Sequence, residues 1–547
     1  MRVSQVLASN MKTWGIDRVF GIPGKPISPM MLDLDSEGIE FVLTRHEAGA
    51  GFAAAGYAMG SRKLGVALGT SGPGGTNLLT AAGQAKAYNL PLLILTGQPS
   101  ASDSGKALGQ DSSYFGTDLV KMFEPVTLFS ARVERADLLS MYLRHALERA
   151  LTGPKGPVHL CIPFDILMSQ VEPFALSLPI NIPQAISPNA EEAIPLLNAA
   201  QRPVLFLGKG VNAADAYEEV RILAEHWNIP VITTPGGKGV FPTKHPLCLG
   251  NFGLGGTAQA RDYLKSGVDL LIAVGTKLSD MTLSGFTADM MPKQVIHFDY
   301  DITFIGKTLD VPTLPVLGDA KGNLQRLIAT AKASSRMYEA AATLESPPPA
   351  VPEYNALGEL SAAFAVKALR SALPDDAVVF GDDGSHTFYA IRHFDIVEPG
   401  TFHFDDVFGA MGHAIGYAIG AKAARPDRTI VCLTGDGCAM MHGMEISTAV
   451  NHRIPVIFVV LNNGRLDMVD KGMSHNTGRS VGAIYRNPLD TAMFARSLGA
   501  EGVCCRTSEE IRAAVADAVK ADVPTVIEIM VDPLETPPIL SRLLSLD

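Results

Sequence analysis

The strongest candidates for chemistry in this sequence are an aspartate and an asparagine that each follow an apolar run. Asp436 follows the run 429–434 after one glycine, and Asn463 follows the run 455–461 after one asparagine. If both runs are neighbouring strands of a parallel sheet, their carboxyl ends meet at the same edge. Carboxylate and amide oxygens suit Mg²⁺, and the glycines that flank Asp436 let backbone N–H groups approach an anion. The pair predicts a metal–phosphate site, although an ordinary strand-to-helix turn explains the aspartate motif taken alone.

A second carboxylate, Glu47, follows the apolar run 41–44 and opens a segment of small residues at 48–60. The alternative for Glu47 is a favourable interaction with the helix dipole, the usual role of an acidic residue in a first helical turn. Two further segments, residues 21–24 (Gly-Ile-Pro-Gly) and 70–77 (Thr-Ser-Gly-Pro-Gly-Gly-Thr-Asn), are rich in glycine. Glycine there permits a close backbone approach to a ligand that a side chain would block.

The elements that must position these residues follow from the hydrophobic pattern. Short runs rich in Val, Ile and Leu recur along the chain and are separated by segments of helical periodicity, such as 3–14, 47–60 and 76–88. This pattern is typical of strands buried on both faces of parallel sheets with crossover helices, so we predict an α/β fold of three doubly wound parallel-sheet domains. The predicted strands are 19–22, 41–44, 64–69, 92–96 and 158–162, then 203–208, 230–233, 270–275 and 294–301, and finally 377–381, 429–434, 455–461 and 525–531.

Two proline-containing segments, 173–188 and 346–349, interrupt the pattern and are read as linkers. They predict domains at 1–175, 188–340 and 355–547. The first and last thirds share a similar rhythm, which suggests two related halves that flank a different centre.

Composition excludes several classes of protein. The chain has 547 residues, 47% hydrophobic and 18% charged, with a net charge of −11, so neither a disordered protein nor a nucleic-acid-binding one is expected. No apolar stretch approaches the roughly 20 residues that span a bilayer, and residues 1–19 do not resemble a secretion signal. We therefore expect a cytoplasmic enzyme without a membrane partner. The six cysteines lack paired CxxC spacing, so neither a structural zinc site nor a disulfide framework is expected.

The strand–GDG–helix–strand–NN array resembles the cofactor motif of enzymes that depend on thiamine diphosphate. In that family the aspartate, the second asparagine and a backbone carbonyl two residues later hold Mg²⁺, which grips the diphosphate. The resemblance implies that Asp436, Asn463 and the carbonyl of Arg465 are the metal ligands.

The same resemblance implies roles for residues elsewhere in the chain. Glu47 is the expected catalytic acid beside the cofactor's pyrimidine, where it favours the imino form that removes the thiazolium C2 proton. Ser385 and His386 are expected donors to the diphosphate, and Met411 is the wedge that bends the cofactor, although a satisfied histidine and a core methionine are the alternatives. The implied cofactor-binding set is Pro23, Gly24, Glu47, Ser385, His386, Gly409, Met411, Gly435, Asp436, Gly437, Cys438, Asn463, Leu466 and Met468.

Within this family the chain looks most like acetolactate synthase and its relatives, on the His46-Glu47 helix, the 70–77 loop, the Thr-Gly-Gln-Pro segment 96–99 and the Gly-Ala-Met-Gly segment 409–412. Gln110 matches a glutamine that lines the substrate pocket, with an ordinary exposed glutamine as the alternative, and we assign it with Glu47 to the catalytic set.

Four departures from the synthase pattern stand out. Residues 468–472 read Met-Val-Asp-Lys-Gly where the synthases carry a tryptophan that shapes the second keto-acid site. Cys438 replaces a commoner serine. Lys25 stands where glycine or serine is frequent, and Lys277 stands where an arginine is frequent in the flavin pocket. Of these, Lys25 could meet an anionic substrate, with a solvated lysine as the alternative. His413 and His442 are weaker candidates for proton transfer.

The central third resembles the flavin-binding domain of the synthases at 253–257, 275–280 and 297–301. FAD is therefore considered alongside thiamine diphosphate and Mg²⁺, and the alternative is that these are ordinary glycine-rich turns in a vestigial or nucleotide-binding domain.

The resemblance implies decarboxylation of a 2-keto acid followed by ligation of the acyl unit to a second carbonyl. A simple decarboxylase that releases an aldehyde, and a non-catalytic cofactor-binding protein, are the alternatives. Because the site would combine Glu47 with a metal site in the last domain, the resemblance predicts a homodimer or homotetramer. The pocket around Gln110, Asp467 and Lys471 limits the substrate without naming it.

Overall fold

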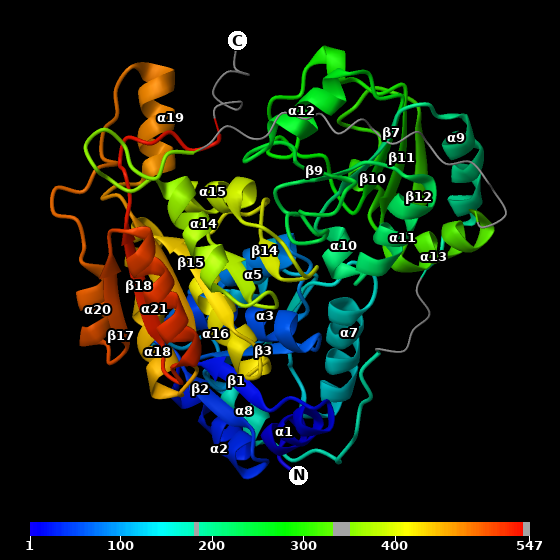
Figure 1. The fold of residues 1–547 in the computed structure, drawn as a ribbon. Coiled ribbons are helices and arrows are strands. Elements are labelled where there is room, and N and C mark those ends of the chain that lie inside the picture. The colour runs from blue at the N-terminus through cyan, green and yellow to red at the C-terminus, as the bar shows by residue number, and fades with distance from the viewer. Residues whose placement is uncertain (180–184, 332–350, 540–547) are drawn as a thin grey trace.

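The computed structural model describes residues 1–179, 185–331 and 351–539. These residues form three six-stranded sheets, one in each third of the chain, in which all the strand pairings are parallel (Figure 1). The predicted α/β class with three parallel-sheet domains is confirmed. No helix among the described residues is both long and apolar enough to cross a bilayer.

The first sheet has the strand order β2-β1-β3-β4-β6-β5. Its principal helices include α3, which starts at Glu47, and α5, which covers most of the predicted helix 76–88. The strands are β1 (Arg18–Gly21), β2 (Glu40–Leu43), β3 (Gly65–Gly69), β4 (Leu92–Gln98), β5 (Phe129–Arg132) and β6 (Pro157–Pro163), and the helices are α1 (Val3–Thr13), α2 (Ser28–Ser36), α3 (Glu47–Ser61), α4 (Pro73–Thr76), α5 (Leu79–Ala87), α6 (Leu119–Phe123), α7 (Leu139–Leu151) and α8 (Phe164–Met168).

The central sheet has the order β12-β11-β10-β7-β8-β9, so its strand order reverses between β10 and β7. Its strands are β7 (Pro203–Leu207), β8 (Val231–Thr233), β9 (Cys248–Asn251), β10 (Leu270–Val274), β11 (Gln294–Asp299) and β12 (Thr313–Leu317), and its helices are α9 (Ala193–Ala199), α10 (Gly210–Ala213), α11 (Tyr217–Trp227), α12 (Ala258–Lys265) and α13 (Ala320–Ala331).

The third sheet has the order β14-β13-β15-β16-β18-β17, which repeats the order of the first sheet strand for strand. This identity confirms two related halves around a different centre. The strands are β13 (Val378–Gly381), β14 (Phe402–Phe404), β15 (Ile430–Gly435), β16 (Ile457–Asn462), β17 (Glu501–Cys505) and β18 (Thr525–Met530), and the helices are α14 (Ala362–Ala372), α15 (Ser385–His393), α16 (His413–Ala424), α17 (Asp436–His442), α18 (Ile446–Asn451), α19 (Asp467–Thr477), α20 (Thr491–Ser497) and α21 (Ser508–Lys520).

Five strands were not predicted: β5, β9, β12, β14 and β17. Each lies at the edge of its sheet. In β5, β9, β12 and β17 most residues are half-buried or exposed, so the continuous apolar run of a central strand is not needed, and β14 has only three residues. The linker at 173–188 contains no strand in its described part, and the predicted linker at 346–349 lies outside the described residues.

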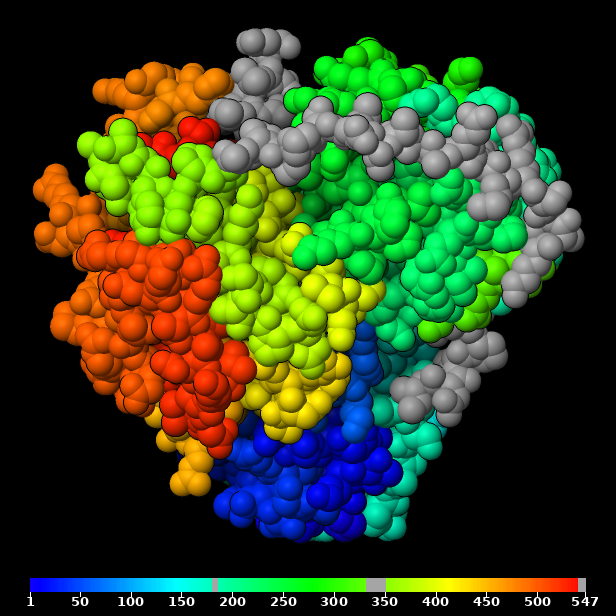
Figure 2. Space-filling model, in the orientation of Figure 1, coloured from blue at the N-terminus to red at the C-terminus, as the bar shows by residue number. Residues whose placement is uncertain are grey.

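Helices α3 and α16 join the first and last thirds in one hydrophobic core and lie side by side in Figure 1. Glycines make this close packing feasible: a Cβ on Gly56 would clash with the carbonyl of Tyr417, and one on Gly420 with the carbonyl of Ala53. Figure 2 shows the central third, in green, packed directly against the last third, in yellow. The backbone hydrogen bond from Gly400 N–H to the Gly239 carbonyl, 2.8 Å long, belongs to that contact.

Candidate functional site

A cavity of about 400 Å³ opens at the carboxyl edge of the third sheet, where β13, β15 and β16 end. Every cofactor-binding and metal-binding residue predicted in the last third of the chain lines it. These are Ser385, His386, Gly409, Met411, Gly435, Asp436, Gly437, Cys438, Asn463, Arg465, Leu466 and Met468.

Asp436 starts α17 at the base of this cavity, and its carboxylate accepts hydrogen bonds from the N–H groups of Gly437 (2.9 Å) and Arg465 (3.1 Å). Burial raises the pKa of Asp436 to about 6, a penalty that a bound cation would relieve. The two neighbouring asparagines have different roles. Asn463 lines the cavity, whereas Asn462 points into the protein and donates to Leu489 O (2.8 Å) and Glu528 Oε1 (2.7 Å).

The donor set for a metal is thus one carboxylate, one amide and one backbone carbonyl. Nowhere in the described part of the chain do three or more His, Cys, Asp or Glu side chains gather as a metal-binding group. An all-oxygen set with a single carboxylate suits Mg²⁺, which keeps several ligands from water and phosphate.

Among the buried side-chain groups in the cavity that have no hydrogen-bond partner are Ser385 Oγ and His386 Nε2. Burial lowers the pKa of His386 to about 4, so its imidazole is neutral near pH 7. Unpartnered buried polar groups are costly, and both would be satisfied by a phosphate oxygen. Cys438 also lines the cavity, but its thiol lies 3.1 Å from the Asp383 carbonyl and donates to it.

The cavity narrows where Met411 and Leu466 approach Gly437. A Cβ on Gly437 would lie 3.4 Å from Met411 Cε and still closer to Leu466, so a glycine is needed at this position. Met411 is only half-buried and exposed to the cavity, which is the position expected for a wedge against a ligand.

Asp383 also lines this cavity and was not predicted as a site residue. Its Oδ2 is buried without a hydrogen-bond partner, and burial raises the pKa of its carboxyl to about 7. The sequence signal that could have found it is its place in the same loop as Ser385 and His386.

Glu47 lies outside the cavity lining, at the first turn of α3. It is 8% exposed, and its Oε2 accepts a hydrogen bond of 2.9 Å from Asn77 Nδ2 in the glycine-rich 70–77 loop. Glu445 of the last third holds the start of this helix by accepting from the backbone N–H groups of Arg45 (3.1 Å) and His46 (2.8 Å). The structure therefore keeps Glu47 well positioned but away from the metal ligands of its own chain.

Other predicted residues of the first third lie in the loop that follows β1. Gly24 packs directly against Thr70, and Pro23 and Lys25 are exposed. Thr70 Oγ1 and Ser71 Oγ are buried without partners, as in the cavity of the last third.

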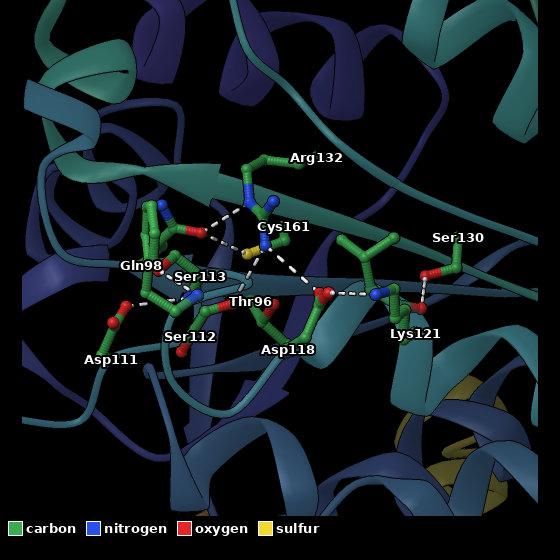
Figure 3. Close-up of polar contacts among 12 residues, drawn as sticks. Thr96, Gln98, Asp111, Ser112, Ser113, Asp118, Lys121, Ser130, Arg132 and Cys161 are labelled. Carbon is green, nitrogen blue, oxygen red and sulfur yellow. Dashed lines mark hydrogen bonds and ion pairs between the residues drawn. The ribbon is translucent and has the colours of Figure 1, made fainter. Parts of the chain in front are cut away.

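Gln110 is exposed at the tip of a loop, with a positive φ of 55°. This loop is fixed by Arg132, which donates to Gln98 Oε1 (2.7 Å) and to the Ser112 carbonyl (3.1 Å) and lies 3.4 Å from Asp118 (Figure 3). Arg132 belongs to the edge strand β5, so sequence reasoning missed both the strand and its role.

The histidines proposed for proton transfer do not line the cavity. His413 is buried, with Nδ1 2.8 Å from the Ala410 carbonyl and 3.2 Å from Asp382 Oδ1. Burial alone would lower its pKa, but Asp382 and neighbouring carboxylates raise it to about 9. His442 packs edge-on against Phe52, with ring centroids 5.3 Å apart.

Of the pair expected near the acceptor pocket, Asp467 lines the cavity, whereas Lys471 is occupied by protein partners. Its Nζ lies 2.6 Å from Asp467 and donates to the Glu535 carbonyl.

The central third does not fit a flavin nucleotide at the point where its strand order reverses. A dinucleotide at such a crevice needs free backbone N–H groups in the turn after the first strand. Here the N–H groups of Gly208 and Gly210 donate to the carbonyls of Val274 (2.9 Å) and Gly275 (2.8 Å).

The other two segments with a flavin resemblance also have protein partners. The Gly255 N–H donates to the Pro538 carbonyl (2.9 Å), and His297 Nε2 lies 2.8 Å from the Thr276 carbonyl. Lys277 stands 5.1 Å from the ring centre of Phe304. Tight turns and domain contacts therefore account for these glycines.

Three family models match the chain in order. They are the N-terminal TPP binding domain of thiamine pyrophosphate enzymes at residues 1–121, the central domain at 190–327 and the C-terminal TPP binding domain at 382–529. The acetolactate synthase large subunit of Corynebacterium glutamicum is 33% identical over 551 residues, which cover 97% of this chain and 87% of the relative.

The acetolactate synthase isozyme 2 large subunit of Escherichia coli is 31% identical over 545 residues, which cover 98% of this chain and 96% of the relative. Both similarities extend over all three sheets. The chain therefore belongs to the thiamine-diphosphate-dependent enzymes of the acetolactate synthase-like family.

Proposed function

We propose that this enzyme uses thiamine diphosphate and Mg²⁺ to decarboxylate a 2-keto acid and to join the acyl unit to a second carbonyl. The observation that carries the proposal is the cavity of the last third. It brings buried, unpartnered Ser385 Oγ and His386 Nε2 together with Asp436, whose carboxyl is held at a raised pKa by burial. A diphosphate and a divalent cation would satisfy all three groups at once.

The chain's own residues then have separate tasks. When bound, thiamine diphosphate supplies the electron sink for decarboxylation. Asp436, Asn463 and the Arg465 carbonyl would hold Mg²⁺, and Ser385 and His386 would donate to the diphosphate. The narrowing at Met411 and Leu466 would orient the ring system and exclude water from the reacting end.

We further propose that each site is completed by a second copy of the chain. The cavity is lined by residues from 362 onward together with Met281, and the Glu47 of the same chain is outside it. Large apolar side chains are exposed on α17, on the turn that follows it and on α20, where a monomer would leave them in water: Met440, Met441, Met444 and Met493. A homodimer in which Glu47 of one chain faces the cavity of the other accounts for both observations.

A simple decarboxylase is the second candidate function. Helix α19 borders the cavity through Met468 and Val469 and contains no Phe, Tyr or Trp, so this wall offers no large ring to hold an acceptor. A wall without an aromatic side chain to hold the acceptor would favour release of the aldehyde over ligation.

A matrix of 2-keto acid donors against aldehyde and keto-acid acceptors tests the proposal, with CO₂ release and product mass measured separately. Donor-dependent CO₂ with a ligated product supports carboligation, and CO₂ with aldehyde alone supports the second candidate. Glu47→Gln should nearly abolish CO₂ release, and Glu124→Gln, a change of the same kind at an exposed position, should not. Absence of CO₂ with every donor would leave a non-catalytic cofactor-binding protein.

We infer that the central domain binds no flavin, because the backbone donors in its glycine turns are already occupied. The absorbance of the purified protein between 350 and about 500 nm, and of the supernatant after acid release, tests this inference. A stoichiometric flavin band would overturn it.

A further inference from the structure

A buried ion cluster joins all three domains beside the 409–412 segment. Lys209, in the turn between β7 and α10, places its Nζ 2.8 Å from Asp405 Oδ1 and 3.4 Å from Asp406 Oδ1. The side chains of these residues are 14%, 0% and 8% exposed. Burial alone would lower the pKa of Lys209, but the two carboxylates raise it above its ordinary value, so the amine stays charged.

The cluster continues into the first domain through Gln84 on α5. Its Nε2 donates to Asp405 Oδ2 over 2.7 Å, in a fully buried contact. Its Oε1 accepts from the backbone N–H of Ala410 over 3.1 Å. Ala410 stands between Gly409 and Met411, which both line the cavity.

The chemistry of these groups fixes the orientation of the Gln84 side-chain amide. An ionised carboxylate can only accept hydrogen bonds, so Gln84 must turn its NH₂ group toward Asp405. Its carbonyl is then left to face Ala410. The ion pair with Lys209 holds the Asp405 carboxylate in place, and this carboxylate keeps Gln84 in the orientation that holds Ala410.

We propose that Lys209 of the central domain is a positioning residue for the cofactor segment 409–412, acting through Asp405 and Gln84 on the Ala410 amide. This inference rests on the proposed function of the cavity and deepens it. The central domain thereby contributes to cofactor binding through Lys209, a residue that does not line the cavity.

A purely structural role is the competing explanation, since a buried ion pair that loses one partner destabilises a protein generally. The two roles differ in what they change. A positioning role loosens the 405–412 backbone specifically, whereas a structural role weakens the whole domain contact. Exchange of backbone amide hydrogens, followed by mass spectrometry of peptides, separates them.

Lys209→Met is the primary variant of the full-length protein. We expect backbone amides in 405–412 to exchange at least about tenfold faster. The Kd for thiamine diphosphate, measured by calorimetry with Mg²⁺ and no substrate, should rise about tenfold, because that is the loss in affinity expected for one well-placed hydrogen bond. At saturating cofactor kcat should stay within about twofold of the original enzyme, because no reacting group has changed.

Two further variants keep the test decisive. Gln84→Met cuts the link to Ala410 but leaves the Lys209–Asp405 ion pair, and should show the same local loosening. Lys209→Met combined with Asp405→Asn removes the negative charge that faces Gln84 and keeps an acceptor for its amide, so protection of 405–412 should return. Lys321→Met, which breaks an exposed ion pair with Asp215, is the matched control.

Unchanged exchange in 405–412 together with an unchanged Kd in folded Lys209→Met would overturn the proposal. So would faster exchange spread evenly over all three domains, or no local effect of Gln84→Met. Failure of the proposed function is distinguishable, because the original protein would then bind no thiamine diphosphate in the calorimeter.

Discussion

A site shared between two chains predicts that two inactive variants restore activity when they are mixed. Glu47→Gln removes the proposed catalytic acid from the first domain. Asp436→Asn removes the proposed metal carboxylate from the last domain. Burial raises the pKa of the Asp436 carboxyl to about 6, so the neutral amide should be tolerated by the fold.

The expected magnitude follows from counting sites. In a homodimer of either variant, both sites carry a defect. In a mixed dimer, one site combines both defects and the other combines the intact Glu47 of one chain with the intact Asp436 of the other. Random assembly from equal amounts gives mixed dimers about half the time, so the mixture should regain about one quarter of the original activity.

The assay is initial CO₂ release after the two variants are unfolded and refolded together, with cofactor and Mg²⁺ in excess. Mixed dimers purified through two different tags should reach about half the original activity, which checks the same count independently. As a control, Asp436→Asn mixed with Asn463→Ala should regain nothing, since both defects lie in the same half-site.

Activity of the Glu47→Gln and Asp436→Asn mixture that stays at the level of the separate variants, while mixed dimers are demonstrably present, would refute the reasoning. Glu47 of each chain would then have to act in the cavity of the same chain. A monomer with full activity would refute it as well.

Three further predictions follow from packing, loop anchoring and charge. Gly420→Ala should lower the free energy of unfolding by about 2 kcal/mol in urea titrations, because its Cβ clashes with the Ala53 carbonyl between α3 and α16. Arg132→Met should raise KM for the keto acid about tenfold and leave cofactor Kd unchanged, because the loop that carries Gln110 loses its anchor. The pKa of His413 is about 9 in the fold and 6.5 ordinarily. Its charged form therefore stabilises the folded protein by about 3 kcal/mol below pH 6.5, and this stabilisation is lost as the pH rises through 9. The free energy of unfolding measured at several pH values checks this prediction.

Each of these has a matched control. Gly109→Ala adds a Cβ where no atom lies within 4 Å and should leave stability unchanged. Lys121→Met, on the exposed side of the same loop anchor, should leave KM unchanged. His413→Asn should flatten the dependence of stability on pH between 6.5 and 9. An equal loss in a control and its partner variant, or an unaltered pH slope, would contradict the corresponding explanation.

The fold was predictable where a strand is buried along its whole length, because burial then requires a continuous apolar run in the sequence. Central strands such as β10 and β16 are buried along their whole length and appear as continuous apolar runs. The edge strand β5 reads Phe-Ser-Ala-Arg and is half-buried throughout, so its sequence has no distinct pattern. Its arginine, which anchors the substrate loop, was missed for the same reason.

The candidate site was predictable where neighbouring strands bring motifs together. Asp436 and Asn463 follow β15 and β16, which are adjacent in the sheet, so local sequence indicated a shared site. Partners that are distant in the chain give no such signal. Glu445 binds the backbone beside Glu47 from 400 residues away, and Lys209 meets Asp405 from another domain.

The repeated strand order of the first and third sheets has a consequence for the dimer. Helices α3 and α16 pack in parallel, since Gly416 lies against Phe52 and Gly60 against Ala424, so Glu47 and the 409–412 segment stand at the same end of the pair. In a shared site, the Glu47 and the cavity of one chain serve different cofactors. A displacement between α3 and α16 would therefore reach both sites of the dimer at once. Because of this, a mixed dimer with Gly420→Ala in one chain only should bind the cofactor more weakly at both sites. A calorimetric titration of that dimer with one unchanged and one weakened site would show that the helices do not transmit the displacement.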